Sequence, residues 1–396
     1  MENGNMTPLV PRQDGRLEWG NGVVSMLFDI AADSPVRLCN VVGRNMVPID
    51  GRLSDDGKPV VEKDPRPIVE VCAANTGSQD NRLTLIATVA GSQLRFVSAL
   101  ASEPEPGSAD PFRLEITQFA PYADLEPKGR EFEPTASERD AADSAANSAS
   151  EAADSNAGLV VTSVFEAFPN LSAVRTYTRL QSARQLPIEA VSSLNLTVPM
   201  RVNCGKVHRS NIFWGDAAWA VENDWRVRPL RDTQVRNRNQ KINPGQSSSR
   251  FAMSSTSTWS SGEHEPAGIL QVEGSVRRAR DFSVMWQIEH NGPWEWEVGE
   301  DDPGLHVTAF GPEYKDHGWF TNLGEGNDFE SVPVSFAIAA GDWQQAVAEM
   351  TLQRRALRIA KARELGRVDQ FEHTQGLVIY NDYMNTLFGD PRIEKE

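Results

Sequence analysis

The succession of short alternating segments is the feature that most constrains the fold. From Leu17 to about Ala340, short runs that are apolar, or that alternate between apolar and polar residues, recur between Gly, Asp, Asn and Pro. A period of two is typical of β-strands, and no helical 3.6-residue spacing separates these runs. A parallel α/β sheet needs helices between its strands and is therefore excluded. We expect an all-β region of large sheets stacked face to face. The expected strands include 23–30, 36–42, 68–73, 83–89, 94–100, 112–119, 159–168, 174–180, 188–198, 211–221, 267–272, 305–310 and 332–339.

Two hairpins are expected within this series. Residues 83–89 and 94–100 should pair across Ala90–Gln93. The second hairpin is Phe282–Glu300, in which two alternating segments flank the turn residues Asn291–Pro293. Its tryptophans would face one way and its glutamates the other. Indole faces stack on the C–H faces of sugar rings and carboxylates accept sugar hydroxyls, so a sugar site is one interpretation. The other is a core hairpin with solvated acids. The residues concerned are Trp286, Trp294 and Trp296, and Glu289, Glu295 and Glu297.

Composition narrows the class of protein. The formal net charge is −16, which repels phosphate backbones and anionic lipids, so we expect neither nucleic-acid nor membrane partners. Cys39, Cys72 and Cys204 are widely spaced, which argues against a disulfide framework or a structural zinc site. The N-terminus has no signal-peptide pattern, and no run is long enough to span a membrane. We expect a cytoplasmic protein with no metal or other cofactor.

Two segments interrupt the strand pattern. Residues 131–158 contain seven acids and one base in an Ala- and Ser-rich background, which is typical of a solvated loop insertion. A functional acidic tail is the alternative. Residues 226–241 are locally basic but lack the spacing of a nucleic-acid reader. We interpret them as a loop that reaches an acidic partner surface, such as another subunit.

The pattern changes after Ala340. Asp342 is a plausible N-cap, apolar residues follow at helical spacing and Gly366 is a natural stop, so a helix is expected over 342–365. The run Leu377–Tyr380 has the continuous apolar character of a strand buried on both faces. Asn381, Asp382 and Tyr383 follow it, where a β/α barrel places its chemistry. The expected organisation is a β-domain (1–340), a linker helix (341–372) and the beginning of a truncated (β/α)₈ barrel (373–396).

These segments together resemble one enzyme family. Met285–Glu300 resembles the signature hairpin of the N-terminal domain of family-36 glycoside hydrolases, the bacterial α-galactosidases of the melibiase type. Ser257–Pro266 resembles a Ser/Thr-rich segment that ends in His-x-Pro in many members, and the helix followed by 377–385 reproduces the family's order. The resemblance implies a β-supersandwich of the galactose-mutarotase-like type, a linker helix and the first strand of an absent (β/α)₈ barrel.

The resemblance also implies a function. Family members are retaining glycosidases that cleave terminal α-galactosides such as melibiose and raffinose, and full-length members often form tetramers. The implied substrate-binding residues here are Trp259, His264, Asn381, Asp382 and Tyr383; Tyr383 stands where many members have Trp. The family's two catalytic Asp residues lie on later barrel strands and have no counterpart in this sequence. The 396-residue fragment is therefore expected to support the fold, oligomer and active-site rim, and to be inactive alone. A stand-alone carbohydrate-binding or assembly module is the alternative.

Overall fold

The computed structural model describes most of the chain between Met6 and Gln370. The described residues are 6–46, 65–74, 76, 85, 87–125, 157–198, 210–218, 221–233, 235, 250–256, 263–272, 281–301 and 304–370. The chain divides into two compact units, Glu2–Gln353 and Arg354–Glu396. Nearly all of the expected insertion 131–158, and all of the expected barrel segment 373–396, lie outside the described residues.

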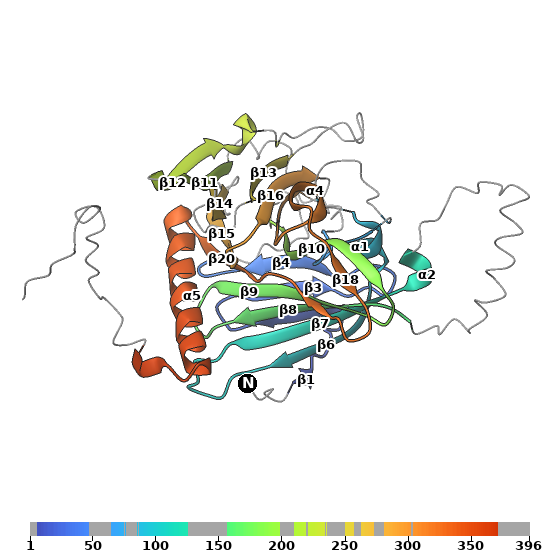
Figure 1. Cartoon of the computed structure of the whole chain (residues 1–396). Coiled ribbons are helices and arrows are strands. Elements are labelled where there is room, and N and C mark those ends of the chain that lie inside the picture. The colour runs from blue at the N-terminus through green and yellow to red at the C-terminus, as the bar shows by residue number, and fades with distance from the viewer. Residues whose placement is uncertain are drawn as a thin grey trace, which may run out of the picture. The chain divides into compact units, whose positions relative to one another are not determined.

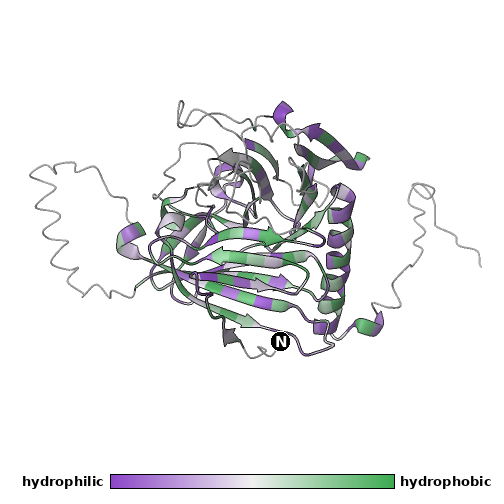
Figure 2. Cartoon of the chain, turned by 180° about the vertical axis from the view of Figure 1, so that it is seen from behind, coloured by the Kyte–Doolittle hydropathy of each residue, from purple (hydrophilic) through white to green (hydrophobic). Residues whose placement is uncertain are grey.

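The first unit contains a large antiparallel sheet of eleven described strands (Figure 1). β7 alternates between buried and half-exposed positions, as the period of two predicts, whereas the central strands β15 and β20 are buried almost throughout. Figure 2 shows hydrophobic and hydrophilic residues alternating along strands of this sheet. The order is β1 (Thr7–Pro8), β6 (Arg95–Ser102), β7 (Phe112–Pro121), β8 (Gly158–Ala167), β9 (Ala173–Ser182), β20 (Val334–Ala340), β15 (Phe282–Ile288), β14 (His264–Val272), β11 (Ser210–Ala218) and β12 (Val221–Pro229), with β19 (Phe329–Glu330) beside β9.

Two smaller sheets complete the described β-structure. The six-stranded sheet has the order β13 (Arg250–Ser255), β16 (Trp294–Asp301), β17 (Gly304–Phe310), β10 (Leu186–Thr197) and β18 (Thr321–Leu323), with β5 (Val71–Ala73) also paired to β10. The three-stranded sheet is β2 (Arg16–Gly20), β3 (Ser25–Asp29) and β4 (Arg37–Val42). The expected all-β architecture of large stacked sheets is confirmed.

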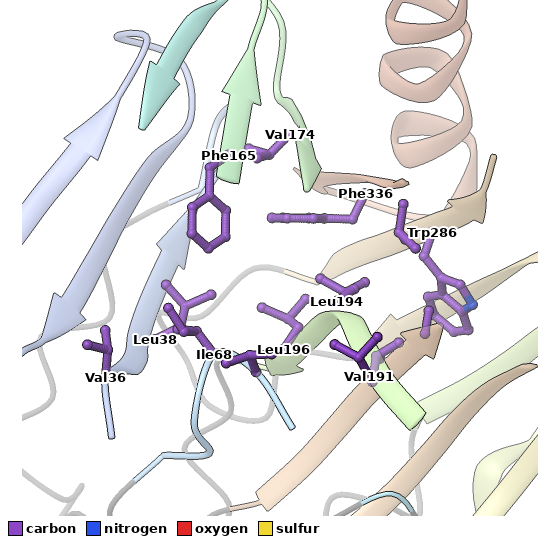
Figure 3. Close-up of a cluster of buried hydrophobic side chains, with 14 of the residues drawn as sticks. Val36, Leu38, Ile68, Phe165, Val174, Val191, Leu194, Leu196, Trp286 and Phe336 are labelled. Atoms are coloured by element: carbon purple, nitrogen blue, oxygen red, sulfur yellow. The ribbon is translucent and has the colours of Figure 1, made fainter. Parts of the chain in front are cut away.

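The core lies between these sheets. Figure 3 shows Phe165 and Phe336 of the eleven-stranded sheet near Leu194 of β10 and Leu38 of β4. These side chains are all buried and belong to one continuous apolar cluster. Burial of this surface is the main favourable term for folding, and its close packing holds the sheets face to face.

The expected hairpin at Phe282–Glu300 is wrong. β15 pairs with β14 and β20 in the large sheet, whereas β16 pairs with β13 and β17 in the six-stranded sheet. The turn Asn291–Pro293 therefore carries the chain from one sheet to the other. Trp286 and Trp296 meet across this crossing, with ring centroids 5.0 Å apart and an interplanar angle of 72°. Both strands form where the alternating pattern predicted them. Tertiary packing, however, pairs them with other strands and not with each other.

The expected hairpin at 83–100 is also wrong. β6 forms as expected, but Val89–Gln93 is a short helix, α1. The Thr88 hydroxyl accepts a hydrogen bond from the backbone N–H of Gly91 and caps this helix. Ala87, just before the cap, has a positive φ of 49°, which is incompatible with a regular strand. Local capping chemistry has replaced the expected strand and turn.

The helix expected at 342–365 is confirmed as α5 (Trp343–Glu364). The Asp342 carboxylate accepts a hydrogen bond from Gln344 N (3.0 Å) at its start. At its end Gly366 has φ +64°, and Gly366 N and Arg367 N donate to the carbonyls of Arg363 and Ala362. That is the Schellman arrangement, which favours glycine. Within the first unit, Ala346 and Met350 of α5 pack on residues of the large sheet, including Ile269 and Met285. No helix in the described part of the chain is long and apolar enough to cross a membrane.

Candidate functional site

His264 is the one implied substrate-binding residue that falls within the described residues; Trp259, Asn381, Asp382 and Tyr383 lie outside them. It begins β14 and stands opposite Asp216 of β11. Its Nδ1 lies 3.0 Å from Asp216 Oδ1, and Asp216 Oδ2 pairs with Arg226 Nε of β12 at 2.6 Å. The Asp216 carboxylate thus bridges a histidine and an arginine on three neighbouring strands.

This group can bind polar ligands. A neutral imidazole that donates from Nδ1 to a carboxylate keeps Nε2 as an acceptor, so the pair with Asp216 selects that tautomer. His264 is half-buried and Arg226 is exposed, so an acceptor and a cationic donor are both near the surface. Hydroxyl groups of a sugar could pair with both. The sequence singled out His264, but Asp216 and Arg226 are distant in the chain and were not expected beside it.

The tryptophans of the signature segment are not a ligand-facing wall. Trp286, Trp294 and Trp296 are buried in the core. The interpretation of these indoles as core residues, and not as a sugar-binding face, is therefore correct. Among the described tryptophans, Trp225 of β12 (37%) and Trp343 of α5 (39%) are the exposed ones, and Trp319 is half-buried.

The glutamates of the segment are not solvated surface groups either. Glu295 and Glu297 are buried, and both pair with Arg250 of β13; the Arg250 Nε to Glu297 Oε2 distance is 2.7 Å. Leu85 N also donates to Glu297 Oε1 (3.0 Å). Burial raises the pKa of Glu297, against the opposing attraction of Arg250 and Arg66. The partners come from distant segments, so the sequence could not show that this face of β16 is covered.

The buried carboxylate of Glu70 was not expected. Glu70 accepts hydrogen bonds from the backbone N–H groups of Ala87 (2.9 Å) and Thr88 (3.0 Å) and from the Thr88 hydroxyl (2.6 Å). Burial raises its pKa, while the positive charge of Arg66 lowers it. Glu70 and Glu297 thus both accept backbone N–H groups of the segment just before α1, which is a structural task. The one sequence signal is an acid inside the apolar run Ile68–Val71.

One acidic group has metal-like spacing among the described residues. Carboxylate oxygens of Glu295, Glu313 and Asp316 lie within 4.8 Å of one another. Glu295 already pairs with Arg250, and Glu313 accepts the N–H groups of Lys315 and Asp316 as the cap of the short helix α4 (Tyr314–His317). Burial raises the pKa of Glu313, but hydrogen bonds from His317 and from those N–H groups outweigh it and lower the pKa overall. The geometry is that of a helix cap.

Comparison with known proteins places this architecture. No protein-family model and no curated protein matches the chain. Among solved structures, the α-galactosidase of Lactobacillus brevis matches with a TM-score of 0.54 and 12% identity over 86% of this chain and 42% of its own. A variant of the GH36 α-galactosidase AgaA of Geobacillus stearothermophilus, crystallised with raffinose, matches with a TM-score of 0.54 and 13% identity over 84% and 42%. Another AgaA variant, crystallised with stachyose, matches with a TM-score of 0.53 and 12% identity over 84% of this chain and 42% of its own.

The chain has the fold of the β-rich part of GH36 α-galactosidases. It spans about 42% of the length of these relatives. The predicted resemblance to family 36 is thus confirmed at the level of the fold. At 12–13% identity the likeness carries no substrate or residue role to this chain by itself.

Proposed function

We propose that this chain is the N-terminal, β-supersandwich portion of an α-galactosidase-like retaining glycoside hydrolase acting on terminal α-galactosides of the melibiose and raffinose type. The observation that carries the proposal is the match of 84–86% of the chain to α-galactosidases, two of them crystallised with raffinose or stachyose. Residues 341–372 would link the β-domain (1–340) to a barrel that begins at 373–396. The enzyme would work in the cytoplasm.

The chain's own task in this proposal is support of the fold, the oligomer and the rim of the active site. Retention needs two carboxyl groups about 5 Å apart across the glycosidic bond. The buried acids Glu295 and Glu297 are poor candidates, because Arg250 and backbone groups already occupy them. His264, with Trp259, Asn381, Asp382 and Tyr383, would contact substrate at the rim.

The first test is activity. Purified 1–396 chain is expected to leave a chromogenic α-galactoside and raffinose unhydrolysed, because the proposal assigns the acid/base and the nucleophile to barrel strands outside residues 1–396. Matched Glu295→Gln and Glu297→Gln variants serve as controls. If the wild-type chain hydrolyses either substrate and one of these variants does not, the proposal that this chain has only a supporting role is wrong. The coding DNA after codon 396 gives a second test: an open frame with barrel strands and two Asp residues is expected, and a frame without them contradicts the enzyme proposal.

A carbohydrate-binding or assembly module is the alternative. The exposed indoles of Trp225 and Trp343 favour it, since such rings can stack on sugars. Calorimetric titration of the purified chain with stachyose separates the two proposals. Binding that Trp225→Ala or Trp343→Ala abolishes would favour the module, with Phe320→Ala, another exposed aromatic residue, as the control. Undetectable binding would favour the enzyme portion.

A further inference from the structure

The outer strand of the large sheet, β12, has an exposed edge. Among the described strands it pairs with β11 alone. Most of its residues are exposed, among them the apolar Val221 (56%) and Val227 (58%). The local basic charge predicted a loop over 226–241; residues 226–229 are instead strand, followed by a 3₁₀ turn at Leu230–Asp232. An exposed edge strand offers backbone N–H and C=O groups to another chain.

The charges along β12 are arranged symmetrically about Trp225. Two acids, Glu222 and Asp224, precede it, and two arginines, Arg226 and Arg228, follow it at the same spacings. Asp224 and Arg226 are both largely exposed; within the chain Arg226 pairs with Asp224 (3.1 Å) and with Asp216 (2.6 Å), so a contact between copies would share these groups. When such a strand meets a second copy of itself in antiparallel orientation, with Trp225 opposite Trp225, Asp224 faces Arg226, and Glu222 and Arg228 come near one another just outside the ladder. Side chains directly opposite one another have Cβ atoms about 5 Å apart, within reach of an ion pair.

Neighbouring registers are less complementary. An antiparallel pair centred on Asp224 or on Arg226 keeps one kind of acid–arginine pair but places the central charged residue opposite its own copy, and like charges directly opposite are destabilising. A shift by one residue moves the facing side chains to different partners. The charge pattern therefore favours the register centred on Trp225, in which no charged residue faces a like charge.

The two ends of β12 limit how far the pairing can extend. Asn223 has φ +64°, and the β11–β12 register shifts between Asp216 and Ala218, which marks a bulge. Pro229 at the other end has no N–H to donate. A ladder is thus confined to the few residues around Trp225, and the Glu222–Arg228 pairs would form between long side chains beside it. A short two-fold contact closes at two copies and does not propagate.

From these observations we infer that β12 is an interface between two copies of this chain, related by a two-fold axis at Trp225. An unrelated acidic partner fits less well, because Glu222 and Asp224 would repel it. The net charge of −16 opposes association of two copies, so the contact depends on the close pairs of opposite charge. The inference deepens the homo-oligomer part of the proposed function and does not depend on the glycosidase activity.

Charge-swap variants test the contact. Glu222→Arg with Asp224→Arg makes the strand wholly basic, and Arg226→Glu with Arg228→Glu makes it wholly acidic. Sedimentation velocity should show a wild-type dimer and a dissociation constant raised about tenfold or more for each variant alone. An equimolar mixture of the two variants should form the heterodimer. Arg12→Glu reverses an exposed charge away from β12 and should leave the dimer unchanged.

Arg226→Glu also removes the pair with Asp216 within the chain, so a loss of dimer in that variant could come from misfolding. A second double variant therefore leaves Arg226 in place. Glu222→Arg with Arg228→Glu exchanges one complementary pair within the same chain, so it should dimerise like the wild type, whereas Arg228→Glu alone should not. A monomeric wild type would overturn both this inference and the proposed oligomer. If the charge-swap variants dimerise as tightly as the wild type, or if the mixture of the basic and acidic variants does not associate, the β12 contact is wrong but the proposed oligomer is not.

Discussion

Gly268 of β14 lies directly under the indole of Trp286, its partner on β15. A Cβ added at Gly268 would lie 2.4 Å from Trp286 Cζ2 and 2.8 Å from Cε2, distances that real Cβ atoms do not reach. Trp286 is fully buried and packs against Trp296, so it cannot move away freely. Overpacking of this kind costs about 1–3 kcal/mol, and the lower entropy of the unfolded Ala chain returns about 0.4–1 kcal/mol. We expect Gly268→Ala to lower the free energy of unfolding by about 1–2 kcal/mol.

Urea denaturation followed by tryptophan fluorescence measures this change. Gly324→Ala is the matched control, because no atom lies closer than 3.7 Å to the added Cβ and the backbone there has no positive φ. Gly324→Ala should leave the free energy of unfolding unchanged or raise it slightly. Trp286→Phe removes the ring atoms that the new methyl group would meet, so the two substitutions should couple favourably, by about 0.5 kcal/mol or more. A Gly268→Ala variant as stable as the control, or a loss that Trp286→Phe leaves undiminished, would refute the reasoning.

Three further predictions concern the buried acid and the attachment of α5. Because burial raises the folded-state pKa of Glu297, its contribution to stability is complete below the ordinary value of about 4.3 and is lost as the pH rises through the folded pKa. The wild type should therefore lose stability relative to Glu297→Gln as the pH rises above about 4.3, and parallel urea midpoints would contradict this. Glu349→Ala removes the acceptor of Ser172 N (2.8 Å) and the partner of Arg44, and should cost about 2 kcal/mol in thermal or urea unfolding; the exposed Glu364→Ala is its control. Asp342→Ala should cost about 1 kcal/mol through loss of the α5 cap, and an unchanged urea midpoint would show that the cap is dispensable.

Local chemistry was sufficient to predict most elements. The alternation of Phe112–Phe119 and of residues 174–180 corresponds to β7 and β9, because a strand with one buried face needs apolar residues at every second position. Asp342 and Gly366 marked the ends of α5 because a cap and a left-handed C-terminus depend on single residues. The acid-rich segment 131–158 and the elements expected after residue 372 remain predictions, since they lie outside the described residues.

Which elements meet was decided by tertiary structure alone. Nothing in Asn291–Pro293 distinguishes a hairpin turn from a crossing between two sheets, because both need the same turn chemistry. β15 pairs with the preceding strand β14 and the distant β20, and β16 pairs with the following strand β17 and the distant β13. Likewise, alternation shows that Glu297 faces away from Trp296, but only packing places Arg250 and the Leu85 backbone over it. Of the candidate site, the sequence indicated His264, whereas the approach of Asp216 and Arg226 required the assembled sheet. Side-chain periodicity is a local property of the backbone, and burial depends on contacts between distant segments.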